Sequence, residues 1–261
     1  MTIRNSLSNA LPRTAQHRQV NRSGFTLVEL LTVISIIGIL TAILIPTIGL
    51  VQVHARKAKS TSNLQSIGHA ILLYTQANND LLPAPTYGES NTARSAPGSS
   101  NPKQGTWLEE LVPLLEGTVQ HTAGSTAVTI VKWPDALTDP QYVANNGVIT
   151  QSDDQDKRGY GMMTKLYLGD KTSPHYSDAT PTQRQSVKNI KNQGNTIIIG
   201  TSNDVTMEPG DDGTFPQSGS SYSNGDPNRY EGYGLFLFLD GSVQPMNTED
   251  LRKTLANPNS N

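Results

Sequence analysis

A long apolar run near the N-terminus dominates the hydrophobic pattern of the sequence. Between Phe25 and Val51, 18 of 27 residues are apolar, and residues 30–53 contain no charged side chain. A helix of these 24 residues would cover about 36 Å, enough to cross a hydrocarbon core of about 30 Å. The pattern therefore predicts one membrane-spanning helix over residues 25–53.

An amphipathic pattern follows this run. Leu64, Ile67, Ile71 and Tyr74 recur at spacings of three and four, as expected for one buried face of a helix. The sequence Asn78-Asn79-Asp80 predicts its end. Residues 54–79 are therefore predicted to continue the membrane helix, giving a single helix on the order of 80 Å long.

Residues 80–261 have a different pattern. They hold 18 of the 22 Gly and 14 of the 16 Pro, which indicates short elements separated by long loops. The pattern predicts a short helix over 107–116, a buried strand over 195–200, and a hairpin over 234–244 with Asp240-Gly241 in its turn. The expected fold class is α+β, with a small antiparallel sheet laid over the second half of the long helix.

The charged residues are distributed unevenly along the chain, and their distribution bears on membrane orientation and on nucleic-acid binding. Residues 1–24 contain four Arg and no acid, whereas the remaining residues have 16 basic against 22 acidic side chains. Arg56, Lys57 and Lys59 follow the apolar run, so the count of basic residues alone does not fix the orientation in a membrane. The net charge of −2 argues against nucleic-acid binding, and the absence of Cys excludes disulfides, thiolate metal sites and a cysteine nucleophile.

A secretory signal peptide is one interpretation of a basic segment followed by an apolar one. The apolar run is too long for it, and no small-x-small cleavage site follows. A plain signal anchor would explain the length but not Glu29, an ionisable side chain near the start of the run. A carboxylate in a membrane helix costs about 2.5–3.5 kcal/mol on insertion scales, which indicates a functional role.

The octapeptide Gly24-Phe25-Thr26-Leu27-Val28-Glu29-Leu30-Leu31 resembles the cleavage and methylation motif of type IV prepilins and type II secretion pseudopilins. The resemblance implies that a prepilin peptidase cuts after Gly24 and methylates Phe25. Glu29 then becomes the fifth residue of the mature chain, and Pro46 matches a proline common in the family's helix. The implied domains are a leader (1–24), a transmembrane and filament-core helix (25–53), its amphipathic continuation (54–79) and an exported head (80–261).

The expected assembly residues are Phe25, Glu29 and Pro46. The methylated terminus stays cationic, so Glu29 could neutralise the terminus of a neighbouring subunit and set the axial step between subunits. Pro46 and Gly49 predict a kink or local unwinding of the helix. The alternative is a membrane helix that simply tolerates Pro and Gly.

The head also resembles a group of pseudopilin-like proteins abundant in planctomycetes. The resemblance rests on residues 107–116, 159–163, 196–201 and 238–243. Two positions depart from it: Tyr230 stands where the group usually has His, and Trp133-Pro134 where it often has Cys-Pro. No function is carried over for the missing residues.

No catalytic pattern is apparent, so we do not expect an enzyme. The five His are scattered without ligand spacing. Acidic side chains gather in a late loop, and Asp204, Asp211 and Asp212 are candidate Ca²⁺ ligands, as pseudopilins of type II secretion bind calcium in a late loop. No EF-hand spacing supports this, and a solvated acidic loop is the alternative; no other cofactor is expected.

The expected function is that of a pilin-like structural subunit, assembled into a type II secretion pseudopilus or a type IV pilus-like filament. Its expected partners are the prepilin peptidase, copies of itself, other pseudopilins, an inner-membrane assembly platform and the membrane. The expected location is the bacterial inner membrane, with one span and the head in the periplasm or outside. The alternative is a membrane-anchored binding or adhesion module that uses the helix only as an anchor.

Overall fold

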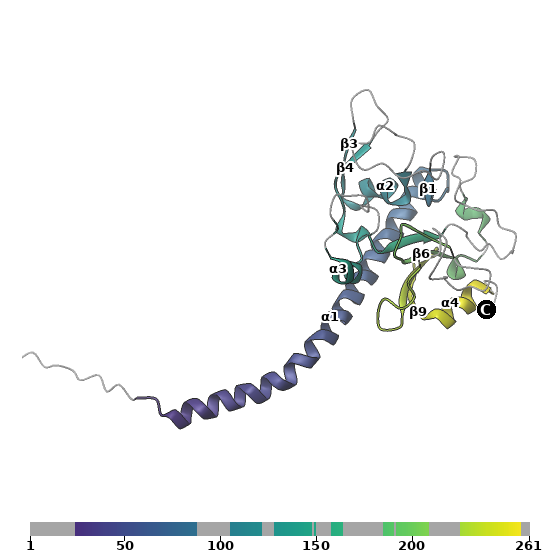
Figure 1. Cartoon of the computed structure of the whole chain (residues 1–261). Helices are drawn as coiled ribbons and strands as arrows, with labels where there is room; N and C mark the ends of the chain where they lie inside the picture. Colours follow the sequence, from purple (N-terminus) through teal and green to yellow (C-terminus); the bar gives the residue numbers. More distant parts are fainter. Residues whose placement is uncertain are drawn as a thin grey trace, which may run out of the picture. The chain divides into compact units, whose positions relative to one another are not determined.

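The computed structural model describes residues 24–87, 105–121, 128–147, 149, 158–163, 185–190, 192–208 and 225–256 (Figure 1). Contacts divide the chain into two units, with the boundary between Ile48 and Gly49. The described part of the first unit holds the first part of helix α1, and the second unit holds the sheet and the core described below. The expected leader, except Gly24, lies outside the described residues.

Helix α1 spans Leu27–Ala77, close to the predicted range. Its backbone is helical without interruption through Pro46 and Gly49, so the local unwinding considered for this region is not present. Asn79 and Asp80 both have positive φ, 55° and 63°, a conformation that Asn and Asp tolerate better than most residues. The helix therefore ends where the Asn-Asn-Asp sequence predicts.

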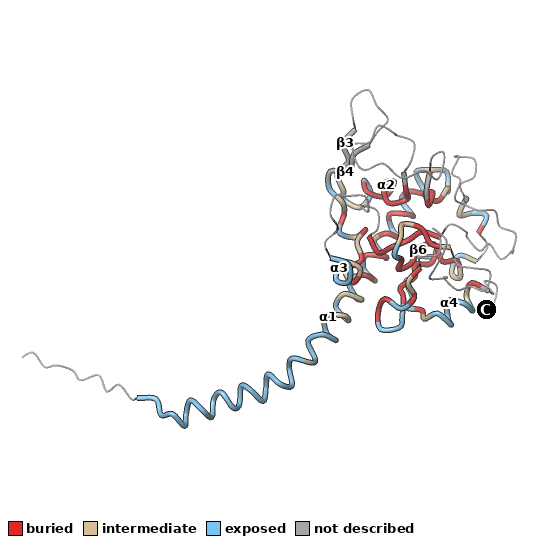
Figure 2. Tube along the Cα trace, viewed as in Figure 1, coloured by how far each residue is buried: buried red, intermediate tan, exposed pale blue. Residues whose placement is uncertain are grey.

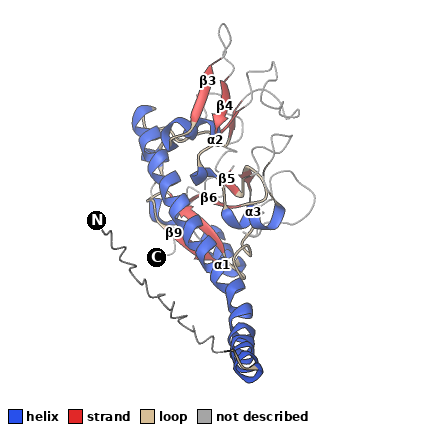
Figure 3. Cartoon of the chain, turned by 90° about the vertical axis from the view of Figure 1, so that its left-hand side faces the viewer, coloured by secondary structure: helices blue, strands red, loops and turns tan. Residues whose placement is uncertain are grey.

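A five-stranded sheet lies in the head, in the order β7-β5-β6-β8-β9. Figure 3 labels three of its strands, β5, β6 and β9. Neighbouring strands are antiparallel except β5 and β7, which are parallel, so the sheet is mixed. The strands are β5 (Tyr160–Met163), β6 (Ile197–Thr201), β7 (Thr206–Met207), β8 (Gly234–Phe238) and β9 (Val243–Met246). The predicted α+β fold is confirmed, with one parallel pair at an edge that was expected to be antiparallel.

The second half of α1 packs on this sheet through the predicted face. Leu64, Ile67, Ile71 and Tyr74 are all buried in one hydrophobic cluster with residues of β5, β6 and β8. Gly68 faces β8: a Cβ there would be 3.1 Å from Leu237 Cδ1. The spacing of the apolar side chains in residues 64–74 therefore matches the face of α1 that contacts the sheet.

The remaining elements are short. They are β1 (Thr86–Tyr87), β2 (Gly105–Thr106), α2 (Trp107–Leu111), η1 (Val112–Leu115), β3 (Thr118–His121), β4 (Val128–Lys132), η2 (Asp135–Leu137), α3 (Pro140–Asn146), η3 (Val187–Asn189), η4 (Gln193–Asn195) and α4 (Thr248–Ala256). The predicted helix over 107–116 is thus α2 followed by η1. Pro113 falls in the first turn of η1, where its missing N–H is tolerated.

The predicted hairpin joins β8 to β9, but its turn is longer than the two residues expected for Asp-Gly. Phe238 N donates to Ser242 O (2.9 Å), and Gly241 N donates to Phe238 O (2.9 Å). Only Gly241 has positive φ, 86°, while the Asp240 carboxylate accepts from Ser242 N. Asp240 therefore stabilises the turn with its side chain and leaves the unusual backbone conformation to glycine.

Candidate functional site

The expected processing site lies just before α1. Phe25 is 78% exposed, and no described atom lies within 4 Å of the position that a Cβ on Gly24 would occupy. The described part of the fold therefore has room for a larger residue at position 24. A small residue here is better explained by what binds the segment than by the segment's own packing.

Glu29 closes the first turn of α1 in a capping box with Thr26. The Glu29 carboxylate accepts from Thr26 N (2.9 Å) and Thr26 Oγ1 (2.8 Å), while Thr26 Oγ1 lies 3.2 Å from Glu29 N, which donates to it. Such a box satisfies amide groups that have no partner within the helix. Glu29 therefore has a partner within its own chain, in addition to the intermolecular one expected from the sequence.

The first part of α1 is exposed on every side. Its large apolar side chains between Phe25 and Val51 are 45–80% exposed (Figure 2). The four hydroxyl side chains of α1 before Val51, those of Thr32, Ser35, Thr41 and Thr47, each donate to a carbonyl three or four residues earlier. Since a hydroxyl in lipid needs such a bond, this helix is suited to a nonpolar environment. Within the described residues, α1 holds the one stretch long and apolar enough to span a membrane.

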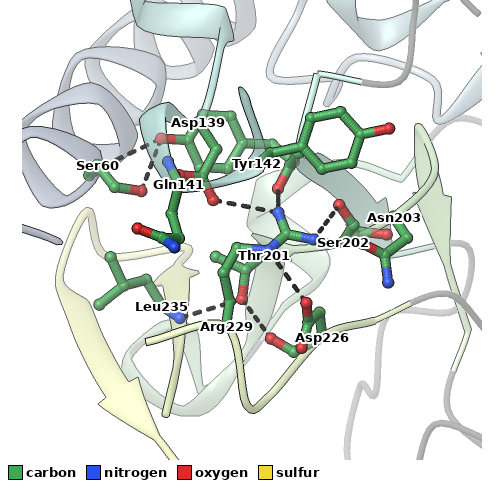
Figure 4. Close-up of polar contacts among 12 residues, drawn as sticks. Ser60, Asp139, Gln141, Tyr142, Thr201, Ser202, Asn203, Asp226, Arg229 and Leu235 are labelled. Atoms are coloured by element: carbon green, nitrogen blue, oxygen red, sulfur yellow. Dashed lines mark hydrogen bonds and ion pairs between the residues drawn. The ribbon is translucent and has the colours of Figure 1, made fainter. Parts of the chain in front are cut away.

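A second site, buried in the head, surrounds Arg229 (Figure 4). Nη1 of Arg229 donates to Asp139 Oδ2 (3.1 Å) and Gly159 O (2.6 Å), and Nη2 donates to Ser202 O (2.8 Å) and Asn203 Oδ1 (2.6 Å). Nε donates to Asp226 Oδ2 (3.1 Å). All five N–H groups of the guanidinium therefore have acceptors, although the side chain is only 1% exposed.

Asp139 is the fully buried anion of this cluster. Its Oδ1 accepts from Gln141 N (2.9 Å), so that Asp139 is the N-cap of helix α3, and it also accepts from the Tyr230 hydroxyl. Pro140 occupies the first helical position, where proline fits well. Burial raises the pKa of the Asp139 carboxyl, while Arg229, Tyr230 and Gln141 act in the opposite direction by favouring its charged form. We call Asp139, Gly159, Ser202, Asn203, Asp226, Arg229 and Tyr230 the Arg229 cluster.

Polar contacts also connect the head to α1. The hydroxyls of Ser60 and Tyr160 are 2.8 Å apart, and both are buried. Asn63 donates to Thr138 O (2.9 Å), the residue before Asp139. Burial raises the pKa of the Tyr160 and Tyr230 phenols well above the usual value, so both stay protonated under ordinary conditions. The hydrogen bonds of Ser60 and Asn63 fix one rotation of the second half of α1 against the sheet, which apolar packing alone specifies less strictly.

The expected calcium site is only partly within the described residues. Asp204 Oδ1 accepts from Val205 N (2.7 Å), and the nearby Asp226 is committed to Arg229. Asp211 and Asp212 lie outside the described residues. Among those described, no three side chains of His, Cys, Asp and Glu are placed to share a metal ion. The calcium site stays a prediction.

Sequence reasoning did not find the Arg229 cluster. Asp139 and Arg229 are 90 residues apart, and no motif connects them. One local signal was available: Asp139-Pro140 is a typical start of a helix. Tyr230, noted only as a departure from a resembling group, is buried and donates to Asp139.

Comparison with known proteins agrees with the geometry at the N-terminus. Residues 20–45 match a family model described as the prokaryotic N-terminal methylation motif. No curated protein and no solved structure matches the chain significantly. The motif supports a pilin-like N-terminus of the kind that prepilin peptidase processes, and pilin-type proteins are structural. With the apolar part of α1, it indicates a membrane-anchored, single-pass protein. The relationship of the head to the planctomycete group stays a prediction.

Proposed function

We propose that the protein is a pilin-like structural subunit that prepilin peptidase cleaves after Gly24 and that assembles into a type II secretion pseudopilus or a type IV pilus-like filament. The observation that carries the proposal is the placement of the methylation motif. It begins in the segment before α1, where Phe25 is exposed, and runs into a helix whose apolar side chains are not covered by any described residue. Such a surface needs lipid before assembly and other subunits after it. The head lies on the exported side of the membrane.

Assembly, in this proposal, exchanges the partner of Glu29. Before assembly, the carboxylate is held by Thr26. In the filament, it neutralises the methylated terminus of a neighbouring subunit. A charge pair has stronger hydrogen bonds than the neutral groups of Thr26, so the exchange favours the register that brings the two charges together.

Cleavage is tested by replacing Gly24. Gly24→Val should leave the chain uncut, still carrying residues 1–24, because a branched side chain prevents the peptidase from closing around the scissile bond. The change should not affect folding, since a Cβ at this position meets no described atom. Gly24→Ala, which stays small, is the matched control and should be processed. Both are scored by mass spectrometry of membrane fractions, and normal cleavage of Gly24→Val would contradict the proposed processing.

Assembly is tested by replacing Glu29. Glu29→Leu should insert into the membrane and accumulate, because it removes a costly carboxylate. It should fail to enter filaments, because one charge of a buried pair is left alone, which costs about 3–5 kcal/mol, or two or more powers of ten in incorporation. Shearing of cells followed by immunoblotting measures this. Normal incorporation would instead favour the membrane-anchored binding module.

A further inference from the structure

Three basic residues follow the apolar part of α1. Arg56, Lys57 and Lys59 lie within four consecutive positions, and with them the chain after Gly24 still has 22 acidic against 16 basic side chains. The cleavage and assembly proposed above do not use them. We call these three residues the basic ring.

The positions of the three basic residues on α1 indicate whether they bind a layer that the helix crosses or a partner helix. Successive residues of an α-helix are turned by about 100°, so Lys57 lies about 100° from Arg56 on one side and Lys59 about 60° from it on the other, and the three cover about half of the circumference of α1. Along the axis they span only about 4.5 Å. A stripe that meets a partner helix continues over several turns, whereas these three charges are gathered within one turn, at one level along the axis, which fits a layer that the helix crosses.

The head contributes an aromatic side chain to the same level. Lys57 Nζ lies 5.3 Å from the centroid of the Tyr233 ring, and Tyr233 is 43% exposed. Arg56 Nη1 lies 3.4 Å from Gln141 Oε1 of α3, which holds the guanidinium against the head. A tyrosine beside a lysine, each with an apolar body and a polar tip, is the pairing favoured where hydrocarbon meets water.

We propose that the basic ring and Tyr233 dock the head on anionic phospholipid headgroups before assembly. This inference rests on the membrane anchoring proposed above. The uncharged residues 30–53 cover about 36 Å, so the ring follows the hydrocarbon core directly and falls in the headgroup layer. Electrostatic attraction to anionic lipid contributes about fivefold in affinity for each basic side chain near the surface.

An acidic side chain in the same turn as Tyr233 opposes this docking. Glu231 is exposed in the turn that Tyr230 and Tyr233 close by two backbone hydrogen bonds. Its carboxylate is repelled by the same headgroups that attract the ring. The surface therefore offers substitutions of both signs: removal of a lysine should weaken docking, and removal of the Glu231 charge should strengthen it.

The test uses the full chain in lipid nanodiscs. Because the protein has no Cys, Asn228→Cys gives a single labelling site, on an exposed residue of the loop that carries Tyr233. A fluorophore at this site is quenched by a nitroxide attached to lipid headgroups. Quenching should rise as anionic lipid replaces zwitterionic lipid, and the rise should disappear in 1 M salt, where the screening length is about 3 Å.

Variants identify the residues responsible. Lys57→Gln with Lys59→Gln should lower the apparent affinity for anionic lipid about 25-fold and abolish the rise. Lys57→Arg should keep it, and Glu231→Gln should reach half-maximal quenching with less anionic lipid. Lys253→Gln on α4, a change of the same charge, should have no effect. Thermal melting checks that each variant is folded.

The outcomes separate the two proposals. Quenching that does not depend on anionic lipid, or a rise that survives loss of both lysines, would overturn headgroup docking while leaving the filament subunit intact. If the lysine variants instead weaken self-association at unchanged quenching, the ring binds the acidic head of a second copy, which also overturns docking to lipid. A wild-type chain that does not co-elute with the discs would contradict the membrane anchoring itself.

Discussion

Arg229 connects segments that are far apart in the sequence. Its guanidinium bonds Asp139, the loop before β5, the segment after β6, and Asp226. Buried ion pairs contribute little net stability compared with apolar replacements, but removal of one partner leaves the other uncompensated. Removal of Arg229 alone should therefore destabilise the head by more than the intact ion pair stabilises it.

We predict that Arg229→Met lowers the free energy of unfolding of the head by about 3–5 kcal/mol, because Asp139 stays buried without its cation. The double variant Arg229→Met with Asp139→Asn should recover part of the loss, since the neutral amide is less costly to bury. Urea denaturation of the four proteins in a double-mutant cycle measures the coupling. Additive losses would show that Asp139 and Arg229 do not depend on each other.

At the scale of elements, prediction from sequence worked where one local pattern dominates. The spacing of Leu64, Ile67 and Ile71 predicts the buried face of α1, and Asp240-Gly241 predicts the hairpin. It did not identify β7, a two-residue strand whose parallel pairing with β5 depends on contacts from elsewhere. The Arg229 cluster was missed for the same reason, since its partners meet only after the sheet has formed.

Gly200 shows how a strand position can depend on its neighbour. It pairs with Phe236 across β6 and β8, and a Cβ at Gly200 would lie 2.4 Å from the Phe236 ring. Gly200→Ala should therefore destabilise the head by about 1–3 kcal/mol through overpacking. Gly68→Ala is the control, because its nearest contact is the flexible end of Leu237 and alanine favours the helix. Thermal melting should separate the two variants; equal melting temperatures would contradict the close packing at Gly200.

At the scale of the whole molecule, the division of the chain predicts that the head is soluble and monomeric without the apolar part of α1. The starting residue matters, because Ser60 bonds Tyr160. A protein starting at Arg56 keeps this bond, whereas one starting at Thr61 leaves a buried phenol without its partner, at about 1–3 kcal/mol. The longer protein should melt several degrees higher. Aggregation of both, with a soluble full-length chain, would contradict the two-part architecture.

The buried phenols also predict a dependence on pH. Burial raises the pKa of Tyr160 and Tyr230 in the folded head, while an unfolded tyrosine ionises near pH 10. Their contribution is fully present below pH 10 and is lost above it, because only the unfolded chain can then release these protons. The loss is about 1.4 kcal/mol per pH unit for each phenol. Melting curves recorded between about pH 8 and pH 11 measure this loss of stability. The Tyr160→Phe variant should show a shallower decline.

Formation of the Arg229 cluster has to wait for the last part of the head. Asp139 leaves the ribosome 90 residues before Arg229 does, and it has to stay in water until its cation arrives. Strands β8 and β9 follow later still, so β6, the central strand, lacks one of its two neighbours until then. Contacts over such separations form slowly. The head therefore completes its fold in one late step after its chain has emerged, and a chain interrupted before residue 229 stays open to proteases.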